Sequence, residues 1–410
     1  MEDHEIHTLP NGIKIVHKQV TNTRVVHCGF IMDIGSRDEL PHQQGIAHFW
    51  EHMAFKGTTR RRAFHIINRL ESVGGELNAY TSKEKICFYA SVLDNHFGNA
   101  VELLSDITFD SIFPEKQIEK ERGVILEEMA MYHDAPEDAI QDDFDMSIFG
   151  SHPLGHNILG TTETVRSFRR DDFRAFIREN MDTGRIIFSS VGPIPMKKVI
   201  RQVEKHINDV PAMSAVRDRL PFDQYKPNRQ VIHRELTQAQ CAIGRTAYPT
   251  SHDLRLPFFM LLNILGGPGM NSRLNLALRE KYGFVYSVEA SYTSYTDTGM
   301  FAVYFGTEHR QLDKSMKLVL KEMKKLREVP LGTLQLHRAK EQLIGQLAMA
   351  EENHMNFMLM MGKSLLDLDR IESLEEVFTS IRDVSSQQLQ ELANEIFDEG
   401  TLSTLTYLPK

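Results

Sequence analysis

Five residues near the N-terminus, His48-Phe-Trp-Glu51-His52, carry two imidazoles and one carboxylate. Histidines four residues apart on a helix project to the same side and can bind zinc together, while a carboxylate between them can accept a proton from water. The alternative is an exposed helix with two solvated histidines, because so short a pattern also arises by chance. The flanking sequence must decide between these two interpretations.

The flanks of this motif, residues 45–57, predict a buried helix. Apolar side chains surround the polar ones on all sides, the only tryptophan among them, and a helix that is apolar all round is usually buried. At 100° per residue the three polar side chains project within about 100° of one another. Buried histidines and carboxylates are costly unless they are paired or bind a metal. We expect Gly57 to cap this helix and Gly45 to leave room on the polar face for an approaching group.

A third ligand is needed, because catalytic zinc usually has three protein ligands and one open position. Residues 115–134 predict a helix with a core-facing stripe. That stripe consists of Ile118, Ile125, Met129 and Tyr132. Glu121 and Glu128 fall on its edge, whereas Glu127 points to the opposite side. Glu128 is therefore the expected third ligand, with Glu121 as a supporting partner; the alternative is that both carboxylates reach solvent.

The composition indicates a globular protein of two or more domains. The chain has 410 residues, of which 41% are hydrophobic and 25% charged. Its net charge of −9 argues against a nucleic-acid partner. No apolar run is long enough to span a bilayer, so we expect no membrane partner. The acidic segment 133–145 could attract basic peptides or could be a solvated surface.

The termini and the cysteines indicate a cytoplasmic location. The N-terminal residues MEDHEIHTLPNG are acidic and polar, unlike a signal or transit peptide. Cys28, Cys87 and Cys241 are scattered and odd in number, which is not the pattern of a disulfide framework. We expect them to be reduced core residues.

A weak internal repeat predicts two related α+β domains. Residues 79–92 resemble residues 290–305, and Tyr80-Thr-Ser recurs as Tyr292-Thr-Ser after 212 residues. Shifting the histidine motif by the same offset reaches Met-Leu-Leu-Asn-Ile, which has no metal ligands. We therefore expect an N-terminal catalytic domain over 1–210, a linker over 211–228 and a related C-terminal domain over 229–410 without a metal site.

These residues resemble the pitrilysin/insulinase family of zinc peptidases, whose metal motif is the inverted form H-x-x-E-H. The resemblance extends over nearly the whole chain, and the nearest branch comprises short, two-domain peptidases related to mitochondrial processing peptidase. The stretches that carry it, besides the histidine motif, are GSRDE (35–39), GGELNAYTSKE (74–84), ERGVILEE (121–128), GMNSRLNLALREKYGFVYSV (269–288) and LHRAKEQLIGQL (336–347). It implies an α+β fold of two related domains, each an antiparallel sheet with helices packed on one face.

The activity that the resemblance implies is zinc-dependent endopeptidase action on peptides or unfolded segments. One Zn²⁺ per chain is held by His48, His52 and Glu128, Glu51 is the general base that activates the zinc-bound water, and Glu121 supports the ligands. One alternative is a non-catalytic or partner-dependent subunit of a heterodimeric processing peptidase. A second alternative is a zinc hydrolase that acts on a non-peptide substrate.

The resemblance also implies how substrate is held. Residues 77–82 read as a strand, and in the family the matching strand is an edge to which the substrate adds; the positions that carry over are Asn78, Ala79 and Tyr80. Arg279 would anchor the substrate, and Tyr286 would support its carbonyl as charge develops. Because this pair lies in the second half of the chain, we expect a dimer, as a homodimer or with a related chain, in which the pair serves the partner's zinc.

Overall fold

The computed structural model describes residues 4–216 and 219–410, which form two compact units. Each unit combines separate segments of the chain. The first contains the segment that ends at Met129, His156–Arg219 and Met349–Ser373; the second contains Ala130–Gly155, Leu220–Ala348 and Leu374–Lys410. A single division at 211–228 therefore does not separate the units, because each half of the chain contributes one segment to the other unit.

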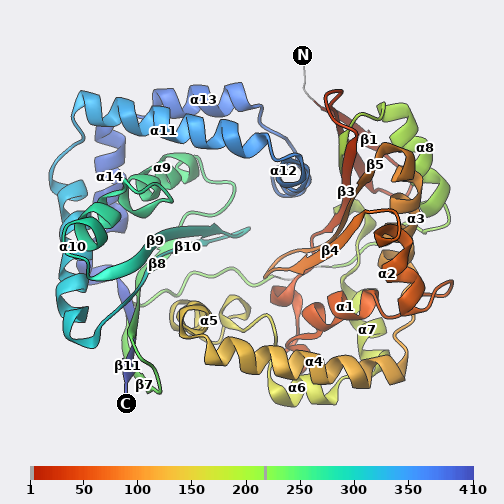
Figure 1. Ribbon diagram of the computed structural model, residues 1–410, viewed down its shortest axis with the longest axis horizontal. Coiled ribbons are helices and arrows are strands. Elements are labelled where there is room, and N and C mark those ends of the chain that lie inside the picture. The colour runs from red at the N-terminus through yellow and green to blue at the C-terminus, as the bar shows by residue number, and fades with distance from the viewer. Residues whose placement is uncertain (1–3, 217–218) are drawn as a thin grey trace. The chain divides into compact units, whose positions relative to one another are not determined.

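The first unit is built on a six-stranded sheet with the order β1-β2-β6-β3-β5-β4. Figure 1 labels β1, β3, β4 and β5 of this sheet. Its strands are β1 Glu5–Thr8, β2 Lys14–Gln19, β3 Val25–Met32, β4 Glu76–Thr81, β5 Ile86–Leu93 and β6 Ile186–Gly192. Only β2 and β6 pair in parallel; every other pairing is antiparallel. The predicted strand at 77–82 is thus confirmed as β4, and it lies at the edge of the sheet.

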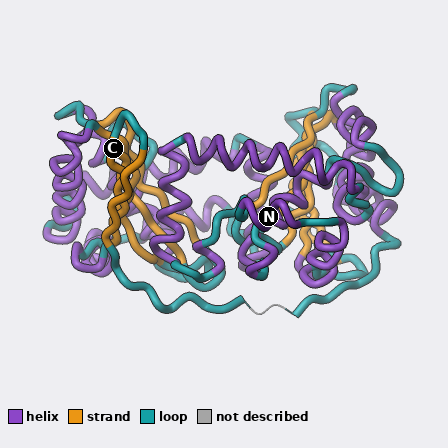
Figure 2. The backbone as a smooth tube through the Cα atoms, turned by 90° about the horizontal axis from the view of Figure 1, so that it is seen from below, coloured by secondary structure: helices purple, strands orange, loops and turns teal. Residues whose placement is uncertain are grey.

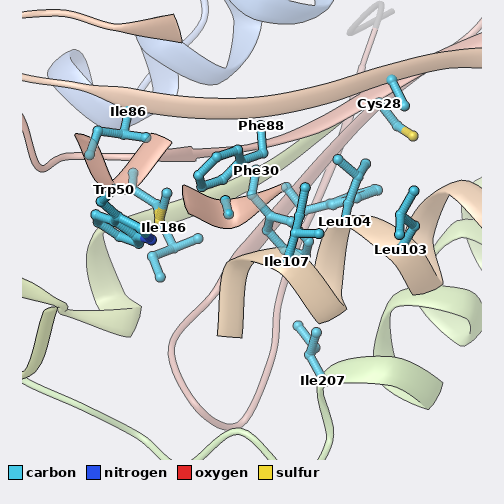
Figure 3. Packing of buried hydrophobic residues seen from close by; sticks show 14 of the residues in the cluster. Cys28, Phe30, Trp50, Ile86, Phe88, Leu103, Leu104, Ile107, Ile186 and Ile207 are labelled. Atoms are coloured by element: carbon cyan, nitrogen blue, oxygen red, sulfur yellow. The ribbon is translucent and has the colours of Figure 1, made fainter. Parts of the chain in front are cut away.

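Helices and a large apolar core cover one face of this sheet. The helices of this part of the chain are α1 Ile46–Ala54, α2 Ala63–Glu71, α3 Phe97–Phe109, α4 Glu115–Asp134, α6 Thr162–Ser167, α7 Arg170–Asn180 and α8 Met196–Ile207. Figure 3 shows Phe30, Phe88 and Trp50 within the core. The Trp50 ring meets the Phe88 ring edge-on at a centroid distance of 6.2 Å. Burying one such aromatic side chain contributes about 1.5–3 kcal/mol, so α1 is held firmly against the sheet.

The opposite face of the same sheet is covered by α12, His354–Leu368, which comes from the second half of the chain. Its side chains Met358, Met361 and Leu365 pack on β2 and β6. Gly362 allows close contact, because a Cβ at this position would lie 2.0 Å from Cδ1 of Ile31 on β3. The family resemblance implies helices on one face of each sheet only. The structure has a helix on the second face of this sheet as well.

The second unit repeats the plan with a five-stranded sheet in the order β7-β11-β8-β10-β9. Its strands are β7 Arg229–Arg234, β8 Ala239–Ala247, β9 Val285–Ser294, β10 Gly299–Thr307 and β11 Ser403–Pro409. As in the first sheet, one pairing is parallel, between β7 and β11, and the rest are antiparallel. The two stretches of the internal repeat form the hairpins β4–β5 and β9–β10. Two related α+β domains are therefore confirmed.

Helices lie on both faces of the second sheet as well. The helices that the second half of the chain contributes to this unit are α9 Arg255–Gly266, α10 Leu312–Glu328, α11 Thr333–Glu351, α13 Leu374–Asp383 and α14 Ser386–Ile396, with a π-helical segment at Asn275–Glu280. From the first half of the chain, α5 (Pro136–Phe149) packs on the other face, where Phe144 and Ile148 join a cluster with Tyr407.

The chain between α8 and β7 has no helix or strand over 211–216 and 219–228, and it runs as a loop in Figure 2. Arg219 fastens it to the first unit, because its guanidinium lies 3.0 Å from a carboxylate oxygen of Asp33 and 2.7 Å from one of Asp38. No helix in the described ranges has the length and apolar character that a membrane crossing requires.

Candidate metal centre

The helix that carries the histidine motif starts at a buried position where two backbone segments meet closely. Gly45, its N-cap, has φ 93°, which favours glycine, and a Cβ there would lie 2.5 Å from the carbonyl oxygen of Leu159. The Glu39 carboxylate accepts hydrogen bonds from the backbone N–H groups of Gly45 and Ala47, both at 2.9 Å. Glu39 thereby satisfies donors that the first turn of a helix leaves open. The space predicted at Gly45 for an approaching group is filled by the chain's own backbone, so that prediction is wrong.

The end of this helix also differs from the prediction. α1 ends at Ala54 with Phe55 as C-cap, so Gly57 does not cap it. Gly57 instead has φ 156° and forms an isolated bridge with Arg62. A Cβ at Gly57 would lie 3.2 Å from Cγ of Pro114, which leaves little room for a side chain.

Three side chains from α1 and α4 converge as predicted. The Nε2 atoms of His48 and His52 lie 3.8 Å and 3.6 Å from the same oxygen of Glu128, Oε2. One ligand atom from each residue can be chosen so that all lie within 4.8 Å of one another. Ligands around a tetrahedral zinc are about 3.3 Å apart, given bond lengths near 2.0–2.1 Å, so small side-chain movements suffice to close this group on an ion.

Glu121 orients one of these histidines from behind. Its Oε1 lies 3.0 Å from Nδ1 of His52, and Lys56 contacts its other oxygen at 2.7 Å. Burial alone would raise the pKa of Glu121, but the hydrogen bond from His52 and the charge of Lys56 outweigh it and lower that pKa. An ionised Glu121 holds the proton of His52 on Nδ1 and leaves Nε2 as a ligand atom facing Glu128.

Burial acts in different directions on the pKa values of His48 and Glu128. Burial, helped by the neighbouring His52, lowers the pKa of His48 to about 3, so its imidazole is neutral at physiological pH and can act as a ligand. Its buried Nδ1 has no hydrogen-bond partner among the residues that the structure describes. Burial raises the pKa of Glu128, and the nearby charge of Glu121 adds to that effect. A cation between the helices would offset the cost of burying these carboxylates.

Glu51 stands apart from the three ligands. Its carboxylate accepts a hydrogen bond of 2.6 Å from the hydroxyl of Thr81, the last residue of β4. Burial is the main cause that raises the pKa of Glu51. A carboxyl group with a raised pKa suits proton transfer near neutral pH. The sequence does not reveal the role of Thr81, although it belongs to the stretch quoted for the family resemblance.

The three strand positions predicted to bind substrate differ in their surroundings. Asn78 is exposed, while Ala79 packs against the core shared with α1. Tyr80 projects to the other face, where its hydroxyl is buried beside the Cys87 thiol and its ring lies under Lys363 of α12 at 4.7 Å. The side chain of Tyr80 thus makes its contacts within the first unit. A substrate that pairs with this position would contact the backbone of Tyr80.

Arg279 and Tyr286 belong to the second unit. The guanidinium of Arg279 lies 5.7 Å from the centre of the Tyr286 ring, and Tyr286 is 86% exposed. In the described part of the chain, the segment of α9 at the repeat position of the histidine motif has no metal-ligating group. The pair is therefore open to solvent in a unit without its own metal site.

Two family models match consecutive stretches of this sequence and together cover most of it. Residues 14–162 match the family model for insulinase (peptidase family M16), and residues 167–343 match the model for the peptidase M16 inactive domain. The chain belongs to the M16 peptidase family.

Two curated relatives match this chain over nearly their whole length. A Bacillus subtilis protein described as the uncharacterized zinc protease YmxG is 34% identical over 96% of this chain and 95% of its own. An uncharacterized zinc protease of Rickettsia felis is 33% identical over 98% of this chain and 97% of its own. The likeness therefore covers both units rather than the metal-binding half alone.

Solved structures share the fold at low sequence identity. A protease from Helicobacter pylori superposes with a TM-score of 0.91 at 20% identity and covers all of both chains. A structure from Pseudomonas fluorescens described as a peptidase M16 inactive domain gives 0.92 at 16% identity over 99% of this chain and 98% of its own. These likenesses establish the fold of the complete chain.

Proposed function

We propose that this protein is a zinc-dependent endopeptidase that hydrolyses peptides or unfolded segments. The observation that carries the proposal is the convergence of His48, His52 and Glu128, with Glu51 placed between this group and the edge strand β4. Two histidines and one glutamate form a ligand set of catalytic zinc sites that leaves a position open. The names of the curated relatives, zinc proteases, support the same metal and reaction.

His48, His52 and Glu128 would hold one ion per chain. When bound, zinc supplies a Lewis acid that polarises the scissile carbonyl and makes water at the site more acidic. Glu121 positions His52, as the 3.0 Å hydrogen bond indicates. His48 needs no second partner to be neutral, because burial already lowers its pKa.

Glu51 is the proposed general base. It accepts a proton from the attacking water and delivers that proton to the leaving amine, so its carboxyl group is regenerated in each cycle. The Thr81 hydroxyl donates to Oε2 of Glu51 and leaves Oε1 for the proton. Burial raises the pKa of Glu51, which makes its carboxylate a stronger base toward the attacking water.

The substrate is proposed to bind as an added strand along β4. Among the described residues, β4 pairs only with β5, so its outer edge offers unpaired backbone groups beside Glu51. Main-chain pairing with Asn78, Ala79 and Tyr80 would hold an extended peptide with little sequence preference. Compact folded domains lack such a free segment, so we propose peptides and unfolded segments as substrates.

Completion of the site by a second chain is part of the proposal. The exposed Arg279 and Tyr286 would contact substrate and support the developing charge at the zinc of a partner chain. A homodimer satisfies this requirement, and so does a pair with a related chain. A cytoplasmic location is likewise proposed, from the three cysteines, which are scattered in the sequence, buried and free.

A non-catalytic subunit of a heterodimeric peptidase is the alternative function. One family model matched here carries the description "inactive domain", although it matches the half without ligands. The complete set of His48, Glu51, His52 and Glu128 favours a catalytic chain, because a scaffold subunit would not need a general base.

The test is hydrolysis of a quenched fluorescent peptide by the purified chain, with and without a chelator. Cleavage that the chelator abolishes, and that Glu51→Gln abolishes while zinc stays bound, would establish the proposed activity. The exposed Glu127 on α4 provides a matched control, and Glu127→Gln should cleave as the wild type does. Tight binding of one zinc per chain without cleavage of any peptide would favour the partner-dependent subunit.

A further inference from the structure

We propose that Lys363 forms a carboxylate-binding subsite at the outer edge of β4, which selects peptides with a carboxylate beside Tyr80. The proposal rests on the proposed function, because it takes a peptide paired with β4 as the ligand. It adds a preference in substrate choice that backbone pairing alone cannot provide.

The position of α12 directs Lys363 toward the edge of the sheet. Successive contacts of this helix cross the strands in order: the Met358 carbonyl accepts a hydrogen bond of 2.6 Å from the Ser189 hydroxyl on β6, and Gly362 touches Ile31 on β3. The side chain of Lys363 then spans β5 and places its ammonium 4.7 Å from the ring centre of Tyr80 on β4. With strands about 4.8 Å apart, the next strand outward would be the bound peptide.

The ammonium of Lys363 is half-buried and lacks an anionic partner within ion-pair distance in the described chain. The nearest acid on α12, Asp367, pairs instead with Lys85 at 2.8 Å. Burial lowers the pKa of Lys363, and the positive charge of Lys85 lowers it further, whereas Asp367 and the Cys87 thiol oppose them. The Tyr80 ring holds the ammonium through a cation–π contact but does not neutralise it. A carboxylate placed here would therefore gain a charge-assisted hydrogen bond.

Strand geometry specifies which substrate side chain meets Lys363. In a peptide paired with β4, alternate side chains project to the face that carries Tyr80. The side chain directly opposite Tyr80 would have its Cβ about 4.5–5.5 Å from that of Tyr80, within reach of the ammonium for aspartate or glutamate. The free C-terminal carboxylate of a peptide that ends at this position offers the same chemistry.

Binding to a zinc-loaded Glu51→Gln chain tests the subsite without cleavage. Fluorescein-labelled peptides of one parent sequence, with a single Asp or Asn moved along an otherwise neutral segment, would be titrated by anisotropy. We expect one position at which Asp binds about five- to tenfold tighter than Asn. A second pair, with a free or amidated C-terminus, separates the terminal carboxylate from the side chain.

Variants at Lys363 decide the outcome. Lys363→Met should bring the Asp-to-Asn affinity ratio close to one, Lys363→Glu should invert it, and Lys363→Arg should keep it because the charge remains. Lys197 is an exposed lysine of α8 in the same unit, and Lys197→Met should leave the ratio unchanged.

An Asp preference that survives in Lys363→Met, or that is absent from the parent, overturns the subsite. Cleavage by the chain with intact Glu51 but without any Lys363-dependent preference would retain the proposed function and reject only this inference. If binding shows a Lys363-dependent preference but the chain with intact Glu51 cleaves no peptide, the subsite is retained and the proposed peptidase function is rejected. If no peptide binds, the subsite is rejected, and the cleavage assay alone decides about the peptidase.

Discussion

The Nδ1 atom of His52 and Oε1 of Glu121 are 3.0 Å apart, and this contact joins α1 to α4. Lys56, four residues beyond His52, lies 2.7 Å from the second oxygen of the same carboxylate. The carboxylate is thus held from both sides by residues of one segment. Because Glu121 and Glu128 are seven residues apart on α4, the contact that fixes His52 also sets the position of the ligand opposite it.

We predict that Glu121→Ala lowers zinc affinity about 10- to 100-fold, the usual loss when a partner that orients a histidine ligand is removed. Glu121→Gln should cost less, because its amide oxygen can still accept the proton of Nδ1. Competition with a chromophoric chelator measures the affinity directly. Glu127→Ala, on the exposed side of the same helix, serves as the control. Unchanged affinity in Glu121→Ala would show that His52 is oriented without this carboxylate.

Glu39→Ala should destabilise the protein by about 1–3 kcal/mol. The substitution removes the acceptor of two backbone N–H groups at the start of α1 and leaves those buried donors unpaired. Urea unfolding of the metal-free chain, followed by tryptophan fluorescence, suits this measurement because the single tryptophan lies on α1. Glu71→Ala, an exposed change at the end of α2, should stay within about 0.5 kcal/mol of the wild type. Equal stabilities for the two variants would contradict a capping role for Glu39.

The local parts of this site could be predicted from sequence, since they depend on periodicity along one helix. The span 115–134 and the choice of Glu128 over Glu127 follow from the 100° rotation per residue. The predictions of open space at Gly45 and of a helix cap at Gly57 are wrong for another reason. Each glycine meets a distant segment, Leu159 in one case and Pro114 in the other, that the local pattern does not contain. The packing of α12 on the first sheet is equally long-range, so Lys363 above Tyr80 could not be predicted.

His17 should make stability depend on pH below about pH 6.5, the ordinary pKa of histidine. Burial lowers its pKa below the usual 6.5, although its hydrogen bonds to Ile194 and Ser190 oppose that effect. The folded state therefore binds this proton less readily than the unfolded state, so the contribution of His17 is fully present above pH 6.5 and is lost as pH falls toward the lowered pKa. Subtracting the pH profile of His17→Gln from that of the wild type, both from urea unfolding, isolates this group. A difference that does not change with pH would contradict the assignment.

Gly362→Ala should weaken the attachment of α12 to the first sheet and destabilise the protein by about 1–3 kcal/mol. The added methyl group would lie 2.0 Å from Cδ1 of Ile31 and 3.1 Å from Cβ of Ser189, so either the helix or the strand must shift. Gly123, in the interior of α4, has open space around its Cβ position. Gly123→Ala should therefore stabilise the protein by about 0.5–1 kcal/mol, because alanine favours the helix. Thermal unfolding of both variants separates the two effects. If both changes stabilised the protein, the packing of α12 would tolerate a larger separation than the contact at Ile31 implies.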